Sequence, residues 1–336
     1  MKRSLLLLIP VGAVACTIGS WNHFADIPAG MLGRPQTLAV TLGSQAVFVG
    51  STQGASLAES FIDSYDDSGN HVASWQSSVW GLDWRVAAIA TSVELGRVHA
   101  LHLNGWVVQF DENMNYDTWI TPPLPLYGNS ADRIFCDMTQ AGTGVFYSIA
   151  LEFQPGLGSV PVLWRYEEPD LTWTPSVLPI GPFPNQTRLN CAQVDYDEFL
   201  SELIVVRGPD ELAVVPDDVG QIWRYDPNGA TILSSVTVDW SSVWNRAATA
   251  TSFADVASGD GQVFMAITVA TGGANQRRVM IFDSITGNLV DSSVSDQYLN
   301  PPAGGAGLDI AYDESLNFHI YTTTPELEVI RKTTLQ

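Results

Sequence analysis

Short β-prone runs alternate with polar turns along nearly the whole chain. An apolar run that ends in an acidic turn recurs, and another β-prone run follows each copy, which is the pattern of a β-hairpin. The copies occupy residues 62–70, 107–111, 163–167, 222–229 and 279–288. No segment of useful length shows helical periodicity. The pattern therefore predicts an all-β protein.

The chain also repeats itself on a longer scale. Residues 71–75 followed by 84–92 look like a second copy of residues 236–240 followed by 245–252. Aligning the repeats places unit starts near residues 34, 85, 133, 188, 246 and 306. Four short antiparallel strands per unit, repeated around a ring, are typical of a β-propeller. We predict six four-stranded blades, and seven blades is the alternative that the alignment leaves open.

The last unit ends one strand short. Residues 17–22, near the start of the chain, resemble the outer-strand sequence at 72–76 and supply a candidate for the missing strand. We therefore expect an N-terminal strand to complete the final blade. Such closure hides the sheet edges that would otherwise promote aggregation.

With this repeat pattern the chain resembles the NHL and SMP-30-like propellers of secreted bacterial proteins, a resemblance of fold. SMP-30-like lactonases bind a metal through Glu, Asn and Asp residues of inner strands. Pro227-Asn228-Gly229 is similar to their Asn motif, whereas their early Glu-Gly-Pro signature is absent. The resemblance implies a metal-dependent hydrolase or lactonase as one alternative function. Acidic candidates on or near inner strands are Asp137, Asp195 and Asp309.

Composition and charge exclude several classes of protein. The 336 residues are 46% hydrophobic and 15% charged, which is globular and excludes intrinsic disorder and coiled coils. Lys and Arg number 15 against 36 Asp and Glu, a net charge of −21. This charge repels phosphate backbones, so we expect no nucleic-acid partner.

The first residues read as an export signal. A basic start, an apolar stretch at residues 4–15 and the small residues Ala13-Val14-Ala15 match a cleavable signal peptide over residues 1–15, leaving 16–336 as the propeller. Small residues directly before Cys16 resemble a bacterial lipobox, which implies lipidation of Cys16. Plain secretion and an uncleaved anchor remain alternatives. We expect a periplasmic, outer-membrane lipoprotein or extracellular protein, with membrane contact only through the lipid.

Two further cysteines remain once Cys16 is set aside. Cys136 and Cys191 lie three residues after Arg133 and Arg188, at corresponding positions of adjacent units. An even pair in an oxidising compartment predicts a disulfide, and two buried thiols are the alternative.

An arginine precedes the first strand in five of the six units. If these strands line a channel, the arginines gather at one mouth, where guanidinium groups pair well with carboxylates and other anions. The alternative is that each arginine ties down a neighbouring blade. The five residues are Arg34, Arg85, Arg133, Arg188 and Arg246.

The function expected from these features is binding. We predict a scaffold for a protein or polysaccharide partner at the cell surface, with an acidic ligand at the arginine positions. We predict no cofactor and no metal, since the histidines form no zinc pair and the acidic turns lack a full calcium loop. The hydrolase reading and a structural subunit of a surface assembly are the alternatives.

Overall fold

A computed structural model gives the fold. The residues it describes are 17–27, 33–41, 45–53, 59–77, 85–92, 96–130, 133–156, 158–168, 170, 172–178, 192–207, 219–228, 231–239, 251–271, 274–299, 307–313, 317–324 and 327–335.

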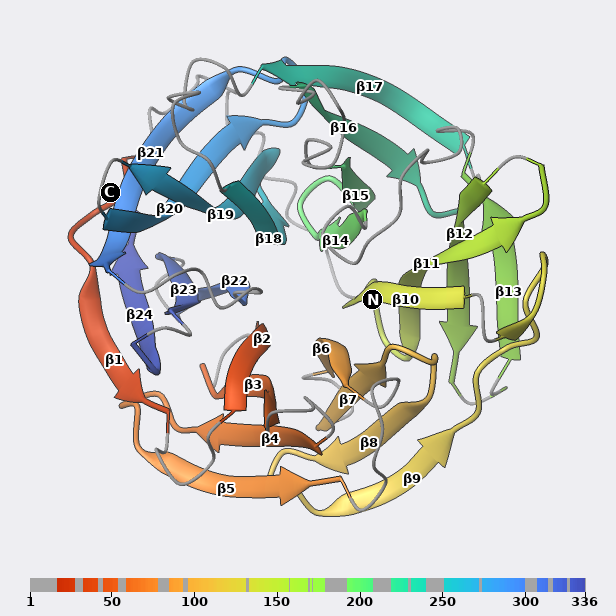
Figure 1. Ribbon diagram of the computed structural model, residues 1–336, viewed down its shortest axis with the longest axis horizontal. Helices are drawn as coiled ribbons and strands as arrows, with labels where there is room; N and C mark the ends of the chain where they lie inside the picture. Colours follow the sequence, from red (N-terminus) through yellow and green to blue (C-terminus); the bar gives the residue numbers. More distant parts are fainter. Residues whose placement is uncertain are drawn as a thin grey trace, which may run out of the picture.

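Six four-stranded antiparallel sheets surround a central axis, as Figure 1 shows. Blade 1 contains β2 (Gly33–Val40), β3 (Val47–Gln53), β4 (Glu59–Tyr65) and β5 (His71–Gln76). Blade 2 contains β6 (Val86–Ser92), β7 (Arg97–His102), β8 (Val107–Asp111) and β9 (Tyr116–Ile120). Blade 3 contains β10 (Arg133–Gln140), β11 (Val145–Gln154), β12 (Gly158–Glu167) and β13 (Thr172–Val177). Blade 4 contains β14 (Gln193–Asp197), β15 (Glu202–Arg207), β16 (Val219–Asp226) and β17 (Thr231–Asp239). Blade 5 contains β18 (Thr251–Gly259), β19 (Gln262–Thr271), β20 (Ala274–Asp283) and β21 (Leu289–Tyr298).

The sixth blade joins the two ends of the chain. β22 (Leu308–Tyr312), β23 (Phe318–Thr324) and β24 (Val329–Thr334) pair with β1 (Asn22–Asp26) as the outer strand. Figure 1 shows this red strand beside the dark blue β24. The prediction of six blades closed by an N-terminal strand is confirmed. Within the predicted segment 17–22, Ile18 makes a single bridge to Leu335, and the continuous ladder begins at Asn22.

The core lies between blades, because each sheet has two faces that only its neighbours can cover. One cluster joins Phe48 and Ile62 of blade 1 to Val98 and Phe110 of blade 2, all fully buried. Similar clusters lie between other adjacent blades. Burial of apolar surface contributes about 25 cal/mol of stability per Å², and this contribution holds the ring together.

An extra residue interrupts the inner strand of several blades. The ladder between the two innermost strands shifts just before Thr37, Ala88, Asp137 and Asp255. A β-bulge of this kind turns the following side chain to a new direction. The repeated bulge therefore sets which side chains line the channel.

None of the described residues forms a helix long and apolar enough to cross a bilayer.

Candidate functional site

A cavity of about 390 Å³ occupies one end of the central channel. Residues of the inner strand of every blade line it, together with residues that follow some of these strands, so all six blades contribute to it. Blades 1 and 2 supply mostly apolar or small residues, namely Leu38, Ala39, Val40, Ile89, Ala90 and Thr91. Blades 3 to 6 each supply an aspartate, namely Asp137, Asp195, Asp255 and Asp309. The lining is therefore apolar on one side and acidic on the other. We call it the channel cavity.

Each of these aspartates bridges to the next blade. Asp137 accepts hydrogen bonds from the backbone N–H groups of Met138 and, in blade 4, Val194, both at 2.8 Å. Asp255 accepts from Val256 at 2.9 Å and from Leu308 of blade 6 at 2.8 Å. The carboxylates thus satisfy backbone donors that the inner strands leave unpaired.

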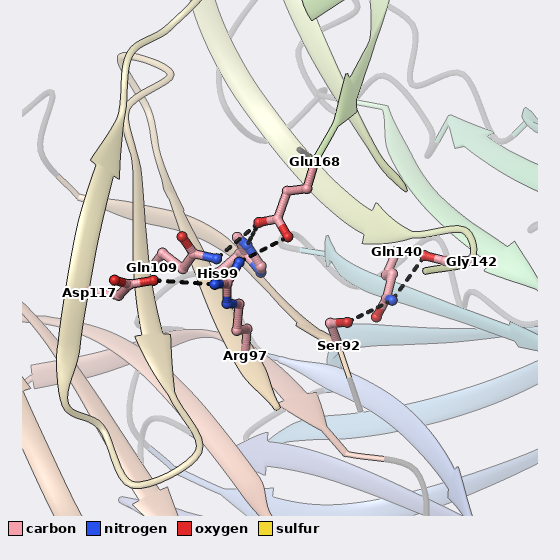
Figure 2. Close-up of polar contacts among 8 residues, drawn as sticks. All are labelled: Ser92, Arg97, His99, Gln109, Asp117, Gln140, Gly142 and Glu168. Atoms are coloured by element: carbon pink, nitrogen blue, oxygen red, sulfur yellow. Dashed lines mark hydrogen bonds and ion pairs between the residues drawn. The ribbon is translucent and has the colours of Figure 1, made fainter. Parts of the chain in front are cut away.

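The other two aspartates repeat this arrangement. Asp195 accepts from the backbone N–H of Ser258 in blade 5 at 2.5 Å, and Asp309 accepts from that of Val40 in blade 1 at 2.7 Å. Two neutral bonds complete the circle: the Thr91 hydroxyl donates to the Val40 carbonyl at 3.3 Å, and Gln140 donates to Ser92 at 3.0 Å, the latter drawn in Figure 2. Side-chain hydrogen bonds therefore link all six blade pairs around the channel.

Burial and mutual repulsion favour the protonated form of these carboxyls. Burial raises the pKa of Asp137 and Asp255 well above the usual value, and the charges of Asp195 and Asp137 respectively add to the effect. Burial, then the charge of Asp195, does the same to the pKa of Asp309. Burial raises the pKa of Asp195 to about 6, although Thr139 and Ser258 donate hydrogen bonds to it. Each aspartate that ionises therefore makes ionisation of the others less favourable.

The raised pKa of Asp195 predicts a measurable pH dependence. A carboxyl with a higher pKa in the folded protein adds stability at low pH, and this contribution is lost as the pH rises from about 4 to about 6. Between those limits the loss is on the order of 3 kcal/mol. Asp195→Asn carries no titrating group, so the stability difference between wild type and variant should shrink over this range. Urea unfolding at several pH values measures it, and a constant difference would contradict the assignment.

Aromatic rings stand beside the channel cavity. Tyr312, which lines the cavity, packs edge-on against Phe318 with ring centroids 4.3 Å apart. Phe199 of blade 4 contacts both rings, with its ring centroid 5.4 Å from that of Tyr312 and 6.1 Å from that of Phe318. The Phe199 side chain is 56% exposed. The adjoining Glu198 is exposed and also lines the cavity. The mouth therefore combines aromatic faces with carboxylates.

The arginine positions that the structure describes do not line the channel cavity. Arg34, Arg85 and Arg133 lie at or just before the starts of inner strands, whereas the cavity is formed by the later parts of these strands. Arg85 lies directly before β6 and is half-buried. Positions 188 and 246 and the side chain of Arg34 lie outside what the structure describes. Anion binding by this set stays a prediction.

Arg133 fits the alternative reading of a structural arginine. It lies four residues before Asp137, whereas positions 34 and 85 lie three residues before Thr37 and Ala88 at the corresponding bulges. Because side chains alternate along a strand, a shift of one residue reverses the direction of the side chain. Arg133 is only 4% exposed, lies 3.7 Å from Glu152 and stacks over Phe135. It is therefore buried in the blade, as expected of an arginine that ties strands together.

Cys136 is disulfide-bonded and 8% exposed. Cys16 and Cys191 both lie outside the described residues, so the predicted pairing with Cys191 stays a prediction.

A second polar cluster, the Glu168 network, lies between blades 2 and 3 (Figure 2). Glu168 follows β12 and reaches to blade 2, where its carboxylate accepts bonds from Arg97 at 3.1 Å, His99 at 3.0 Å and Gln109 at 2.9 Å. His99 and Gln109 are buried, at 1% and 3% exposure. Burial alone would raise the pKa of Glu168, but the bonds and charges of His99 and Arg97 lower it overall. The network therefore joins blades 2 and 3 through hydrogen bonds to a charged carboxylate.

A Ser–His–Asp group on the rim does not have the geometry of a catalytic triad. The Ser74 hydroxyl donates to Asp63 at 2.5 Å, and His71 Nε2 contacts that hydroxyl at 2.8 Å and Asp63 at 3.4 Å. A triad needs the two ring nitrogens to contact different partners, with the serine proton directed to histidine. Here one nitrogen faces both partners and the serine proton points to the carboxylate. Among the residues that the structure describes, no group of three or more His, Cys, Asp or Glu is arranged to hold a metal.

The sequence missed Asp255 and Glu168 as important residues. Asp255 lies at the same bulge position as Asp137, but the bulge is visible only in the paired strands. Glu168 sits in a turn and looks like an ordinary acidic hairpin residue. Its partners lie 59 to 71 residues away in the chain, so no local pattern reveals them.

Comparison with known proteins supports the fold alone. No protein-family model matches the chain, and no curated protein matches it. A Bacteroides thetaiotaomicron structural genomics protein of unknown function is similar with a TM-score of 0.57 and 11% identity, over 94% of this chain and 76% of that one. The WD40 repeats of RRP9 are similar with a TM-score of 0.52 and 7% identity, over 95% and 100%. A chain of the nidogen/laminin complex is similar with a TM-score of 0.47 and 10% identity, over 79% of this chain and 80% of that one.

These identities are too low to carry an activity from one propeller to another. The propeller part of the predicted resemblance is confirmed, and membership of the NHL or SMP-30-like group stays a prediction.

Proposed function

We propose that this protein is a binding scaffold whose ligand carries a positive charge and enters the channel cavity. The observation that carries the proposal is the lining: four aspartates on one side, small and apolar residues on the other, with Glu198, Tyr312 and Phe199 at the mouth. Carboxylates repel anions and attract cations, and aromatic faces also favour cations. The channel cavity therefore suits a lysine, arginine or organic ammonium group.

The volume and the hydrogen bonds of the site agree with this ligand class. About 390 Å³ lies in the usual range for small-ligand sites. The carboxylate oxygens of Asp137, Asp255 and Asp309 each accept one bond from the protein and keep lone pairs that a cationic donor could use. Burial, with mutual repulsion adding to it, raises the pKa of Asp137, Asp255 and Asp309, and a cationic ligand would offset both effects by pairing with the ionised carboxylates. Cation binding is thus favoured here over the acidic ligand expected for the arginine positions.

Peptide titration tests the proposal. We expect an Arg- and Lys-rich fluorescent hexapeptide to bind and Glu198→Gln to weaken its binding about three- to tenfold, because the exposed carboxylate at the mouth is removed while the four aspartates stay in place. Glu112→Gln removes an exposed charge from the β8–β9 turn and should leave binding unchanged. Equal weakening by both variants would show only a general charge effect and contradict the site. Binding of an Asp- and Glu-rich hexapeptide, lost in Arg85→Ala, would favour the arginine positions instead.

We also propose that the protein is exported and lipid-anchored through Cys16. The signal-like residues 1–15 support export, and the disulfide at Cys136 suits an oxidising compartment. Mass spectrometry of the mature protein should find an N-terminus at Cys16 carrying lipid, absent in Cys16→Ser. An unmodified Cys16 would indicate plain secretion, and retention of residues 1–15 would contradict cleavage.

A further inference from the structure

The connection between blades 2 and 3 contains a proline-rich segment at the surface. Residues 121–127 read Thr-Pro-Pro-Leu-Pro-Leu-Tyr and link β9 to β10. Leu124 is 87% exposed and Leu126 is 44% exposed, and the nearby Phe153 is 44% exposed. These apolar side chains lie outside the core that the propeller needs. We call residues 121–127 the proline segment.

Its backbone is stiff for covalent reasons. Pro122, Pro123 and Pro125 each fix φ near −65°, and a residue that precedes proline is pushed towards the β or polyproline II region. Thr121, Pro122 and Leu124 all precede a proline. Every residue from 121 to 125 is therefore restricted, and the segment loses little conformational entropy when a partner binds.

Side chains of blade 3 also hold both ends of the segment. The indole N–H of Trp173 donates to the Thr121 carbonyl at 3.0 Å. At the other end, one oxygen of Glu152 accepts the N–H groups of Leu126 at 2.6 Å and Tyr127 at 3.0 Å. Glu152 is fully buried. The fold thus presents the exposed leucine on a fixed support.

Glu152 is itself held from behind. The indole N–H of Trp164 donates to its other oxygen at 3.2 Å, and Arg133 lies 3.7 Å from that oxygen. The buried Arg133 therefore has a structural role, because its charge balances that of the carboxylate that anchors the proline segment. It is independent of the channel cavity, which neither Glu152 nor the segment lines.

We infer that the proline segment is a docking site for a partner protein with an aromatic-lined groove. Prolines donate no backbone hydrogen bond, so the segment offers carbonyl acceptors, proline rings and leucine side chains. The complementary surface has aromatic rings that form shallow clefts and indole or hydroxyl donors between them. Grooves of this kind recognise proline-rich peptides in the polyproline II conformation.

Binding to isolated groove domains tests the inference. An SH3 domain and a WW domain, labelled for NMR, serve as probes and are titrated with the full chain. We expect shifts at the groove aromatics of at least one probe, weakened about tenfold or more by Leu124→Ser and by Pro125→Ala. Leu299→Ser removes another highly exposed leucine, at 83%, and should leave binding unchanged.

A second variant tests whether the support matters. Trp173→Phe keeps an aromatic ring but loses the donor to the Thr121 carbonyl, so binding should weaken by less than in Leu124→Ser. Thermal unfolding of each variant shows that the propeller is intact. Failure of both probes to bind overturns the inference. Self-association of the chain that the same substitutions abolish also overturns it, in favour of a second copy as the occupant.

Discussion

Glu168→Ala should lower the free energy of unfolding by about 3 kcal/mol, since it leaves buried partners in blade 2 without an acceptor. His99 and Gln109 are almost completely buried and both donate to this carboxylate. Arg97 is 40% exposed and can regain water, so most of the loss comes from the two buried groups. Urea unfolding followed by tryptophan fluorescence measures the effect.

The adjacent residue provides a matched control. Glu167 pairs with Arg165 within the same blade, and both side chains are about one-third exposed. Exposed pairs of this kind contribute about 0 to 1 kcal/mol, so Glu167→Ala should change stability little. If Glu168→Ala costs no more than Glu167→Ala, the Glu168 network is not an energetic link between blades.

Gly307→Ala should also cost about 3 kcal/mol, because the ring closes tightly at this point. A Cβ atom at Gly307 would lie 2.4 Å from the backbone nitrogen of Leu38 in blade 1. Gly307 cannot move away easily, since its N–H donates to the Thr323 hydroxyl at 2.8 Å and its carbonyl accepts from the Thr323 N–H at 3.0 Å. Thermal and urea unfolding should both show the loss.

Gly96→Ala separates this steric effect from the general cost of replacing glycine. Gly96 has a φ of 59° but nothing lies within 4 Å of a Cβ placed there. Only backbone strain of about 1 kcal/mol is expected. Similar losses in both variants would show that contact between blades 6 and 1 is not the cause.

The packing of each blade against its neighbours explains why the fold could be predicted from the sequence. Repeating hairpins predict a propeller because each four-stranded sheet buries two faces, and only a neighbouring copy of the same unit can cover them. The sequence at 17–22 predicted a closing N-terminal strand, which the structure confirms, with a single bridge at Ile18 and the continuous ladder starting at Asn22. Hydrophobic alternation is a local property, so it survives in a single sequence.

The candidate site was much less predictable. Asp137, Asp195 and Asp309 were identified only as scattered acidic residues, and Asp255 was not singled out. Their importance depends on N–H donors in the next blade, for example Val194 for Asp137, 57 residues away. No sequence pattern states which backbone donors the inner strands leave unpaired.

The sequence by itself determined the all-β class and a closed ring of repeated sheets, because these follow from the period of its apolar residues, and it favoured six blades while leaving seven open. The tertiary structure alone decided which charged residues meet. A bulge places Asp137 towards the channel, and a shift of one residue places Arg133 beside Glu152. Side-chain direction in a strand reverses with every residue, so a single extra residue in one strand decides whether a charge faces ligand or core.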